Sequence, residues 1–165
     1  MGGYGSSRWG SHMKKEIVEN CRTLSIFELN HDGLLGPRSW QEGVLIWPKV
    51  YSREDQGRIG FVLDTQSDMP YVRLLYEVGH WNKEPVEFIV QLQTTSCFFG
   101  GQRWWFTCPL TKDGQPCERR VAILYLPPGG RYFGCRDCHE LVYQSSQESN
   151  QSDLPYYLDM EILRA

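Results

Sequence analysis

Six cysteines are the residues of this 165-residue chain whose type and spacing could support chemistry. Four of them form two pairs, with eight residues inside the first pair and two inside the second. A Cys-x2-Cys turn directs two thiolates at one point, and a tetrahedral zinc ion then needs two more sulfurs, which the first pair can supply. We therefore expect one Zn2+ per chain, with four ligands: Cys108, Cys117, Cys135 and Cys138.

This zinc ion is expected to be structural, because four thiolates complete its shell and leave no position for water or substrate. A disulfide framework and free buried thiols are the alternatives. The first twenty residues contain no apolar run typical of a signal peptide, which favours the cytoplasm, where clustered cysteines bind metal more often than they pair. Cys97 could replace one ligand, although we expect it to be a small buried thiol, and His139 is a similar minor candidate.

Motifs for catalysis are missing from the sequence. A zinc deaminase needs His-x-Glu together with Pro-Cys-x2-Cys, but no histidine here has a glutamate two residues on, and Gly134 precedes Cys135. The chain also lacks a phosphate-binding loop, a nucleophile elbow and a dinucleotide fingerprint. An enzyme is therefore the least favoured class, and no small-molecule substrate is evident.

Positive charge is concentrated in two parts of the chain, although the formal net charge is -3. Residues 1–15 carry three cations and no acid, and residues 101–140 have a charge of +2, whereas residues 16–100 have -5. Arginine side chains bind phosphates, and exposed aromatic rings stack on unpaired bases. The candidate nucleic-acid-binding residues are Arg8, Lys14, Lys15, Arg103, Arg119, Arg120, Arg131 and Arg136. The leading hypothesis is a nucleic-acid-binding or regulatory protein.

Two other interpretations of these charges stay open. The arginines could balance the net charge of a four-thiolate zinc site while the aromatic residues form the core. Alternatively, the acidic segment 16–100 could dock on a basic host or defence complex and inhibit it, which would make the chain a protein-interaction factor. No apolar stretch approaches the ~18–20 residues needed to span a bilayer, so no membrane partner is expected.

Local patterns predict an α+β protein that is mainly β. Residues 1–13 are expected to form a flexible glycine-rich arm, although residues 10–13 also match a tag-cleavage scar. Apolar residues recur at three- and four-residue steps within residues 14–35 and predict two short helices. Ser25 can cap the second of these helices, and Gly33 can end it.

Beyond residue 57, β-branched and aromatic residues predict four strands of an antiparallel meander. The expected strands are residues 58–64, 71–78, 85–95 and 102–107. With the helices they make a body of residues 14–107. Five tryptophans are expected at the core or the rim of this sheet: Trp40, Trp47, Trp81, Trp104 and Trp105.

A C-terminal zinc ribbon with four cysteine ligands, residues 108–147, is expected to continue from this sheet. A hairpin that turns at residues 127–130 would bring the two cysteine pairs side by side. We call the segments that carry the two pairs the first knuckle, residues 108–117, and the second knuckle, residues 135–138. Residues 111–116 would form a solvated insertion in the first knuckle. The expected strands of the ribbon are residues 119–126, 131–134 and 141–143. Residues 148–165 are expected to form a tail with a short amphipathic helix.

Three motifs of the C-terminal half stand out together with the arm: FGGQRWWFTCP at 99–109, CERRV at 117–121 and FGCRDCH at 133–139. In these motifs the sequence resembles small proteins of bacteria and their phages or mobile elements, which open with a glycine-rich Arg-Trp arm and end in a zinc ribbon. The first knuckle of that family reads Cys-Pro-x-Cys-Gly-Arg-Arg-Val, so this chain has a six-residue insertion and Glu118 in place of glycine. The resemblance implies a native arm and a zinc ribbon, and it carries no established activity.

Overall fold

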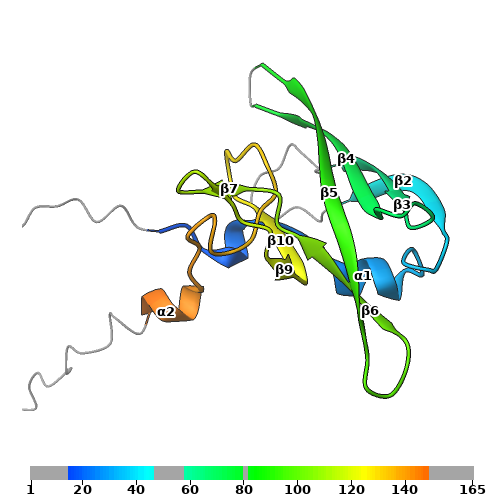
Figure 1. The fold of residues 1–165 in the computed structure, drawn as a ribbon. Coiled ribbons are helices and arrows are strands. Elements are labelled where there is room, and N and C mark those ends of the chain that lie inside the picture. The colour runs from blue at the N-terminus through cyan, green and yellow to red at the C-terminus, as the bar shows by residue number, and fades with distance from the viewer. Residues whose placement is uncertain (1–14, 47–57, 80–81, 149–165) are drawn as a thin grey trace, which may run out of the picture.

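The computed structural model of the protein describes residues 15–46, 58–79 and 82–148, which fold into a mainly β, antiparallel α+β structure (Figure 1). The main sheet has six strands in the order β2-β3-β4-β5-β6-β9, and all neighbours are antiparallel. These strands are β2 Trp40–Ile46, β3 Arg58–Asp64, β4 Tyr71–Val78, β5 Glu84–Ser96, β6 Gln102–Thr107 and β9 Arg120–Val121. The predicted fold class is confirmed.

Alternation of apolar and polar side chains explains the meander from β3 to β6. In β4, Val72, Leu74 and Tyr76 are buried, whereas Leu75 is exposed, which is the period-two pattern of a strand with one face on the core. The strands β3, β4 and β6 have the predicted bounds, and β5 is one residue longer at each end than expected. The sequence pattern therefore predicts this part of the sheet well.

The edge strand β2 is not predicted from the sequence. Most of its side chains are exposed, so it lacks a regular apolar alternation. Gly43 lies opposite Phe61 of β3, and a Cβ added at Gly43 would lie 2.9 Å from the phenyl ring. Backbone pairing and this close ring contact, and not amphipathic patterning, define the strand.

The first of the two expected N-terminal helices is absent, and this prediction is wrong. In its place the chain forms a single 3-10 turn, η1 Val18–Asn20, and then strand β1 Arg22–Ser25. β1 pairs with β10 Ile123–Leu126, and Leu24 lies directly opposite Leu124, with both side chains buried. Strand pairing that buries these two leucines overrides the helical spacing of the segment.

The second expected helix is confirmed as α1 Ile26–His31. Ser25 is its N-cap, and the Ser25 hydroxyl oxygen accepts a hydrogen bond from the Phe27 N–H at 3.2 Å. Gly33 follows the helix with a φ of 71°, which is the left-handed conformation that ends many helices. Leu29 of α1 is buried in the core.

The inner face of the six-stranded sheet is covered by α1 and the β1-β10 pair. After β9 the chain bends at Ala122, whose carbonyl accepts from the Ile26 N–H at 2.9 Å, and then continues as β10. One buried cluster contains residues of β1, α1, β3 to β6 and β10, and also the fully buried Phe133. We call the opposite side of the sheet, which carries Arg103 and Trp105 on β6, the outer face.

The cysteine-rich segment is less regular than the predicted ribbon. The expected strand at residues 119–126 is divided into β9 and β10, and the partner of β10 is β1. The expected return strand at residues 131–134 contributes a single bridge, between Tyr125 and Gly134. The ribbon hairpin is reduced to this bridge because β10 gains more burial by pairing with β1.

The expected third ribbon strand at residues 141–143 is also wrong. Val142 forms a single parallel bridge with Ile17, and the chain then enters a short helix, α2 Gln144–Glu148. The predicted arm, and the predicted tail beyond residue 148, lie outside the described residues. Within the described residues, no helix has the length and apolar character required to cross a bilayer.

The three described tryptophans lie on strands of the sheet, at positions expected to be core or rim, and none of them is fully buried. Trp104 is partly buried and packs against the core, whereas Trp105 is partly buried on the outer face. Trp40, on the edge strand β2, is 52% exposed. Trp47 and Trp81 lie outside the described residues.

Candidate metal centre and the adjacent groove

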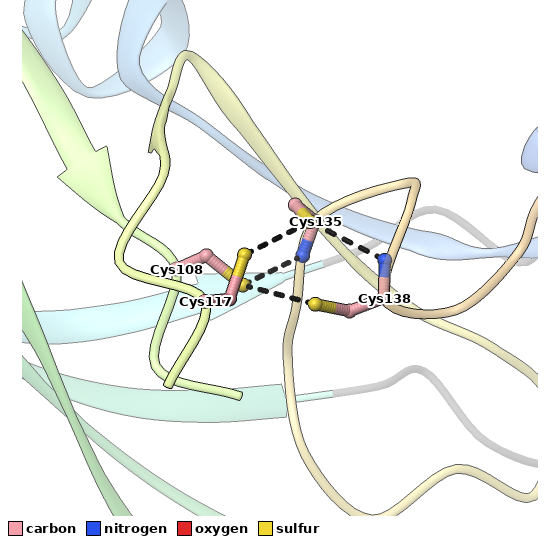
Figure 2. Close-up of side chains that lie close together, drawn as sticks. All are labelled: Cys108, Cys117, Cys135 and Cys138. Atoms are coloured by element: carbon pink, nitrogen blue, oxygen red, sulfur yellow. Dashed lines mark hydrogen bonds between the residues drawn. The ribbon is translucent and has the colours of Figure 1, made fainter. Parts of the chain in front are cut away.

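The second cysteine pair lies in a tight, hydrogen-bonded turn. The Cys138 N–H donates to Cys135 Sγ at 3.4 Å, and the Cys135 N–H donates to Cys108 Sγ at 3.3 Å (Figure 2). Gly134 precedes the turn at a point with no room for a side chain, because an added Cβ would collide with Leu110. Backbone amides therefore face these sulfurs, where they would partly offset the charge of metal-bound thiolates.

The first cysteine pair approaches this turn from the end of β6. The Cys108 N–H donates to the Arg119 carbonyl at 2.8 Å, and the Cys117 N–H donates to the Leu110 carbonyl at 2.8 Å. Glu118, the residue after Cys117, has a φ of 49°. The backbone directly after Cys117 is thus left-handed although the residue is not glycine.

The insertion in the first knuckle is an exposed hairpin, as predicted, formed by β7 Thr111–Lys112 and β8 Gln115–Pro116. It also contacts the second knuckle. Lys112 Nζ donates to the Asp137 carbonyl at 2.9 Å and lies 3.7 Å from the Glu140 carboxylate. The insertion therefore braces the two knuckles against each other.

The structure brings the four predicted cysteines together, with all four sulfurs within 4.8 Å of one another (Figure 2). The Sγ atoms of Cys108 and Cys138 are 3.9 Å apart, and those of Cys117 and Cys135 are 3.8 Å apart. Metal–sulfur bonds of ~2.3 Å place the corners of a tetrahedron about 3.8 Å apart. Disulfide sulfurs would be ~2.05 Å apart. The four cysteines could hold one metal ion, and their spacing does not fit disulfides.

Burial and hydrogen bonding give these thiols different acidities. Burial raises the pKa of Cys108 to about 11 and raises the pKa of Cys138 above its usual range. Burial acts in the same direction at Cys117, but hydrogen bonds from the Arg119 backbone and the other cysteines outweigh it and lower the pKa. A divalent cation stabilises thiolates, so metal binding at this cluster would release protons.

Neither minor candidate ligand belongs to the cluster. Cys97 lies exposed in the turn between β5 and β6, so the expectation of a buried thiol is wrong; a hairpin tip offers no core to bury it. Burial lowers the pKa of His139, which favours a neutral imidazole. The remaining cysteine, Cys21, is buried and its thiol donates to the Ile17 carbonyl at 3.4 Å.

A groove with a volume of about 320 Å³ lies beside the cysteine cluster, and Cys135 forms part of its wall. Three predicted nucleic-acid-binding arginines line it together with three aromatic residues. These residues are Arg119, Arg120, Arg136, Trp105, Tyr125 and Tyr143. The fold thus gathers cations at the start of β9 and in the second knuckle next to aromatic side chains of β6, of β10 and of the segment before α2.

Ion pairs reduce the positive charge of this groove without cancelling it. Arg119 pairs with Asp137, and Arg136 lies 3.8 Å from the same carboxylate. Arg136 also lies over the Tyr143 ring, 5.2 Å from its centroid. Arg120 is exposed and has no ion pair with any described residue. Three arginines and one aspartate give the groove a formal charge of +2.

Two further predicted arginines lie outside the groove. Arg103 extends over the Trp105 ring at 5.4 Å and therefore lies next to the groove on the outer face. Arg131 lies elsewhere: it pairs with Glu84 at 2.6 Å and stands over the Tyr132 ring at 5.7 Å. The Glu84 carboxylate neutralises the charge of Arg131. Arg131 also does not line the groove, so the structure does not group it with the other arginines.

The predicted N-terminal cations do not contribute to this groove in the part of the chain that is described. Arg8 and Lys14 lie outside the described residues. Lys15 is exposed at the start of the first described segment and does not line the groove.

Sequence reasoning missed three groove residues: Tyr125, which it placed in a strand, and Asp137 and Tyr143. Asp137 lies inside the Cys-x2-Cys turn, so its position beside Arg136 was a usable signal for an ion pair. Tyr143 was assigned to a strand, and no regular element links it to Arg136 seven residues earlier. Its contact with Arg136 follows from the path of the chain after the second knuckle.

No family model, curated protein or solved structure matches this chain. Function is therefore inferred from the geometry of the cysteine cluster and the groove.

Proposed function

We propose that the four clustered cysteines hold one structural Zn2+. The sulfur separations of 3.8 and 3.9 Å suit a tetrahedral zinc ion, and thiolates are ligands that zinc favours over harder cations. Four sulfurs close the coordination shell, so the ion would have no open position for a substrate.

The ion would position the arginines of the groove. Arg119 and Arg120 follow Cys117 along the chain with only Glu118 between, and Arg136 is next to Cys135. Fixing the two cysteines at one metal therefore fixes the relative positions of the two groups of arginines. Arg120 is exposed and has no ion pair with a described residue, so its charge is available to a ligand.

We propose that this groove binds the phosphate backbone of a nucleic acid, in a regulatory protein of a phage or mobile element. The observation that carries the proposal is the convergence of three arginines and three aromatic residues on one groove. Arginines bind phosphates and aromatic rings stack on bases. Tyr143 is 43% exposed, so its ring is accessible for such stacking.

Fluorescence anisotropy with labelled DNA and RNA at several salt concentrations tests this function. Arg120→Ala should weaken binding and reduce the slope of log affinity against log salt by about 1, because one phosphate contact is lost. Lys83→Ala is the matched control, since Lys83 pairs with Glu77 at the far end of β4 and β5. Binding without salt dependence, or an Arg120→Ala variant that behaves like the control, would contradict the proposal.

A second candidate function, docking on a host or defence protein complex, is favoured by the apolar character of the outer face. Val44, Ile46 and Leu75 are exposed there, and Val44 and Leu75 flank Gly60, which has no side chain between them. Exposed apolar side chains that adjoin one another are typical of protein interaction sites.

This candidate predicts that host lysate contains a stoichiometric partner captured by the protein. Val44→Asp should abolish that capture while it leaves nucleic-acid affinity unchanged, because β2 lies at the opposite edge of the sheet from β9. Capture that depends on Arg120 and not on Val44 would count against a protein partner.

A further inference from the structure

The hairpin between β5 and β6 carries two exposed phenylalanines at its tip. Phe98 and Phe99 are 95% and 98% exposed, and their rings pack edge to face with centroids 5.2 Å apart. The hairpin extends away from the rest of the described molecule (Figure 1). Two aromatic rings held out in solvent are costly to leave without a partner, so the tip is a candidate contact surface.

The tip has a defined backbone and is not a loose loop. The Gly100 N–H donates to the Cys97 carbonyl at 3.0 Å, and the Cys97 N–H donates to the Gly101 carbonyl at 3.1 Å. Both glycines have positive φ, 90° and 82°, which other residues rarely adopt. The turn therefore fixes the backbone of Phe98 and Phe99 relative to β6.

A line of side chains connects this tip with the groove. Arg103 and Trp105 lie on the outer face of β6, about 7 Å apart along the strand, and the guanidinium of Arg103 covers the indole ring. Trp105 lines the groove, and Arg120 follows on β9, opposite Thr107 of β6. Aromatic and cationic side chains therefore alternate from the tip to the cysteine cluster.

The charge along this line suits a polyanion. The sequence has no acidic residue between Glu87 and Asp113, a stretch that contains the β5-β6 tip and all of β6. A phosphate backbone that leaves the groove along β6 would meet Arg103 and no carboxylate of this stretch.

We propose that Phe98 and Phe99 stack on unpaired bases of the nucleic acid whose backbone lies in the groove, which makes single-stranded DNA or RNA the substrate class. The proposal rests on the proposed nucleic-acid function. In an intact duplex both faces of each base are already stacked, so an exposed phenyl ring gains little from it, whereas unpaired bases offer a free face. Insertion into a membrane is the competing use of such a tip, but one arginine beside two phenylalanines is a weak anchor.

The test compares wild type, the double variant Phe98→Ala/Phe99→Ala, Arg120→Ala and the control Met69→Ala. Met69 is also an exposed apolar residue in a turn between strands, β3 and β4. Affinities are measured for labelled oligothymidylate, oligouridylate and a blunt DNA duplex of equal length. The double variant should lose about tenfold in affinity for both single strands, keep the duplex affinity and salt slope of wild type, and differ from Met69→Ala.

Each other result overturns a particular claim. If Arg120→Ala weakens binding but the double variant does not, the groove function stands and the role of the phenylalanines is wrong. If wild type shows no salt-dependent binding, both fail. If the double variant binds single strands normally and loses binding to phosphatidylserine vesicles, the tip contacts membrane and not bases. Equal affinity of wild type for single strands and duplex also overturns the substrate class.

Discussion

Cys135 contributes to the cysteine cluster through its backbone as well as its sulfur, because its N–H donates to Cys108 Sγ and its Sγ accepts from the Cys138 N–H. Cys135→Ser should leave less than about half an equivalent of zinc per chain and greatly lower the Tm, since structural zinc sites contribute on the order of 10–16 kcal/mol. Metal analysis and thermal unfolding measure both effects. Cys97→Ser is the control, because Cys97 is exposed and outside the cluster.

Asp137 limits the positive charge available in the groove, since it pairs with Arg119 and lies 3.8 Å from Arg136. Asp137→Asn removes that competitor while it keeps the backbone carbonyl that accepts from Lys112. Nucleic-acid affinity should rise about three- to tenfold at low salt, and less at high salt. Anisotropy titration measures the change. An unchanged affinity would mean that the two arginines serve the thiolate charge alone.

Cys21 predicts how stability depends on alkaline pH. Burial, helped by Glu16 and Glu19, raises its pKa from 9.0 to about 11. Because the folded-state pKa is above the unfolded one, the neutral thiol stabilises the fold fully below pH 9, and this contribution is lost as the pH rises through about 11. Relative to Cys21→Ala, wild type should lose up to about 2 kcal/mol of unfolding free energy over this range. Denaturant titrations at successive pH values measure the difference.

At the scale of elements, the first knuckle contains a residue that is unfavourable for its backbone conformation. Glu118 has a φ of 49°, and a left-handed conformation costs a non-glycine residue roughly 1 kcal/mol or more. Glu118→Gly should therefore stabilise the protein by about 1 kcal/mol, measured as a rise in Tm. Glu118→Ala removes the same side chain without relieving the backbone, and it should give no such rise. Equal effects of the two variants would assign the gain to the lost charge.

Elements with a strong local pattern are predictable, and those defined by distant partners are not. β4 alternates buried and exposed residues, so its bounds follow from the sequence. β1 is four residues long and owes its conformation to pairing with β10, about a hundred residues away. The four clustered cysteines were predictable from spacing, because a metal needs a fixed number of sulfurs. Tyr143 was not, since its place beside Arg136 depends on an irregular segment.

At the scale of the whole molecule, the cysteine-rich segment shares its core with the sheet. Phe133 lies two residues before Cys135 and is fully buried in the cluster that contains residues of β3 to β6. Leu124 of β10 is buried in the same cluster opposite Leu24. The sequence predicts a ribbon at residues 108–147 that continues from the sheet, and these contacts predict that the ribbon does not unfold independently of the body.

This coupling gives a prediction for metal removal. A chelator should lower the Tm of the entire protein in one cooperative transition, because releasing the four sulfurs also frees Phe133 from the core that the sheet needs. Far-UV circular dichroism reports the sheet. The chain has six tryptophans, so the difference in fluorescence between wild type and Trp105→Phe reports Trp105 beside the groove. The two signals should change at the same temperature with and without chelator. A fluorescence transition that precedes the loss of β-structure would instead establish an independently folding ribbon, and the groove would then depend on the metal while the sheet would not.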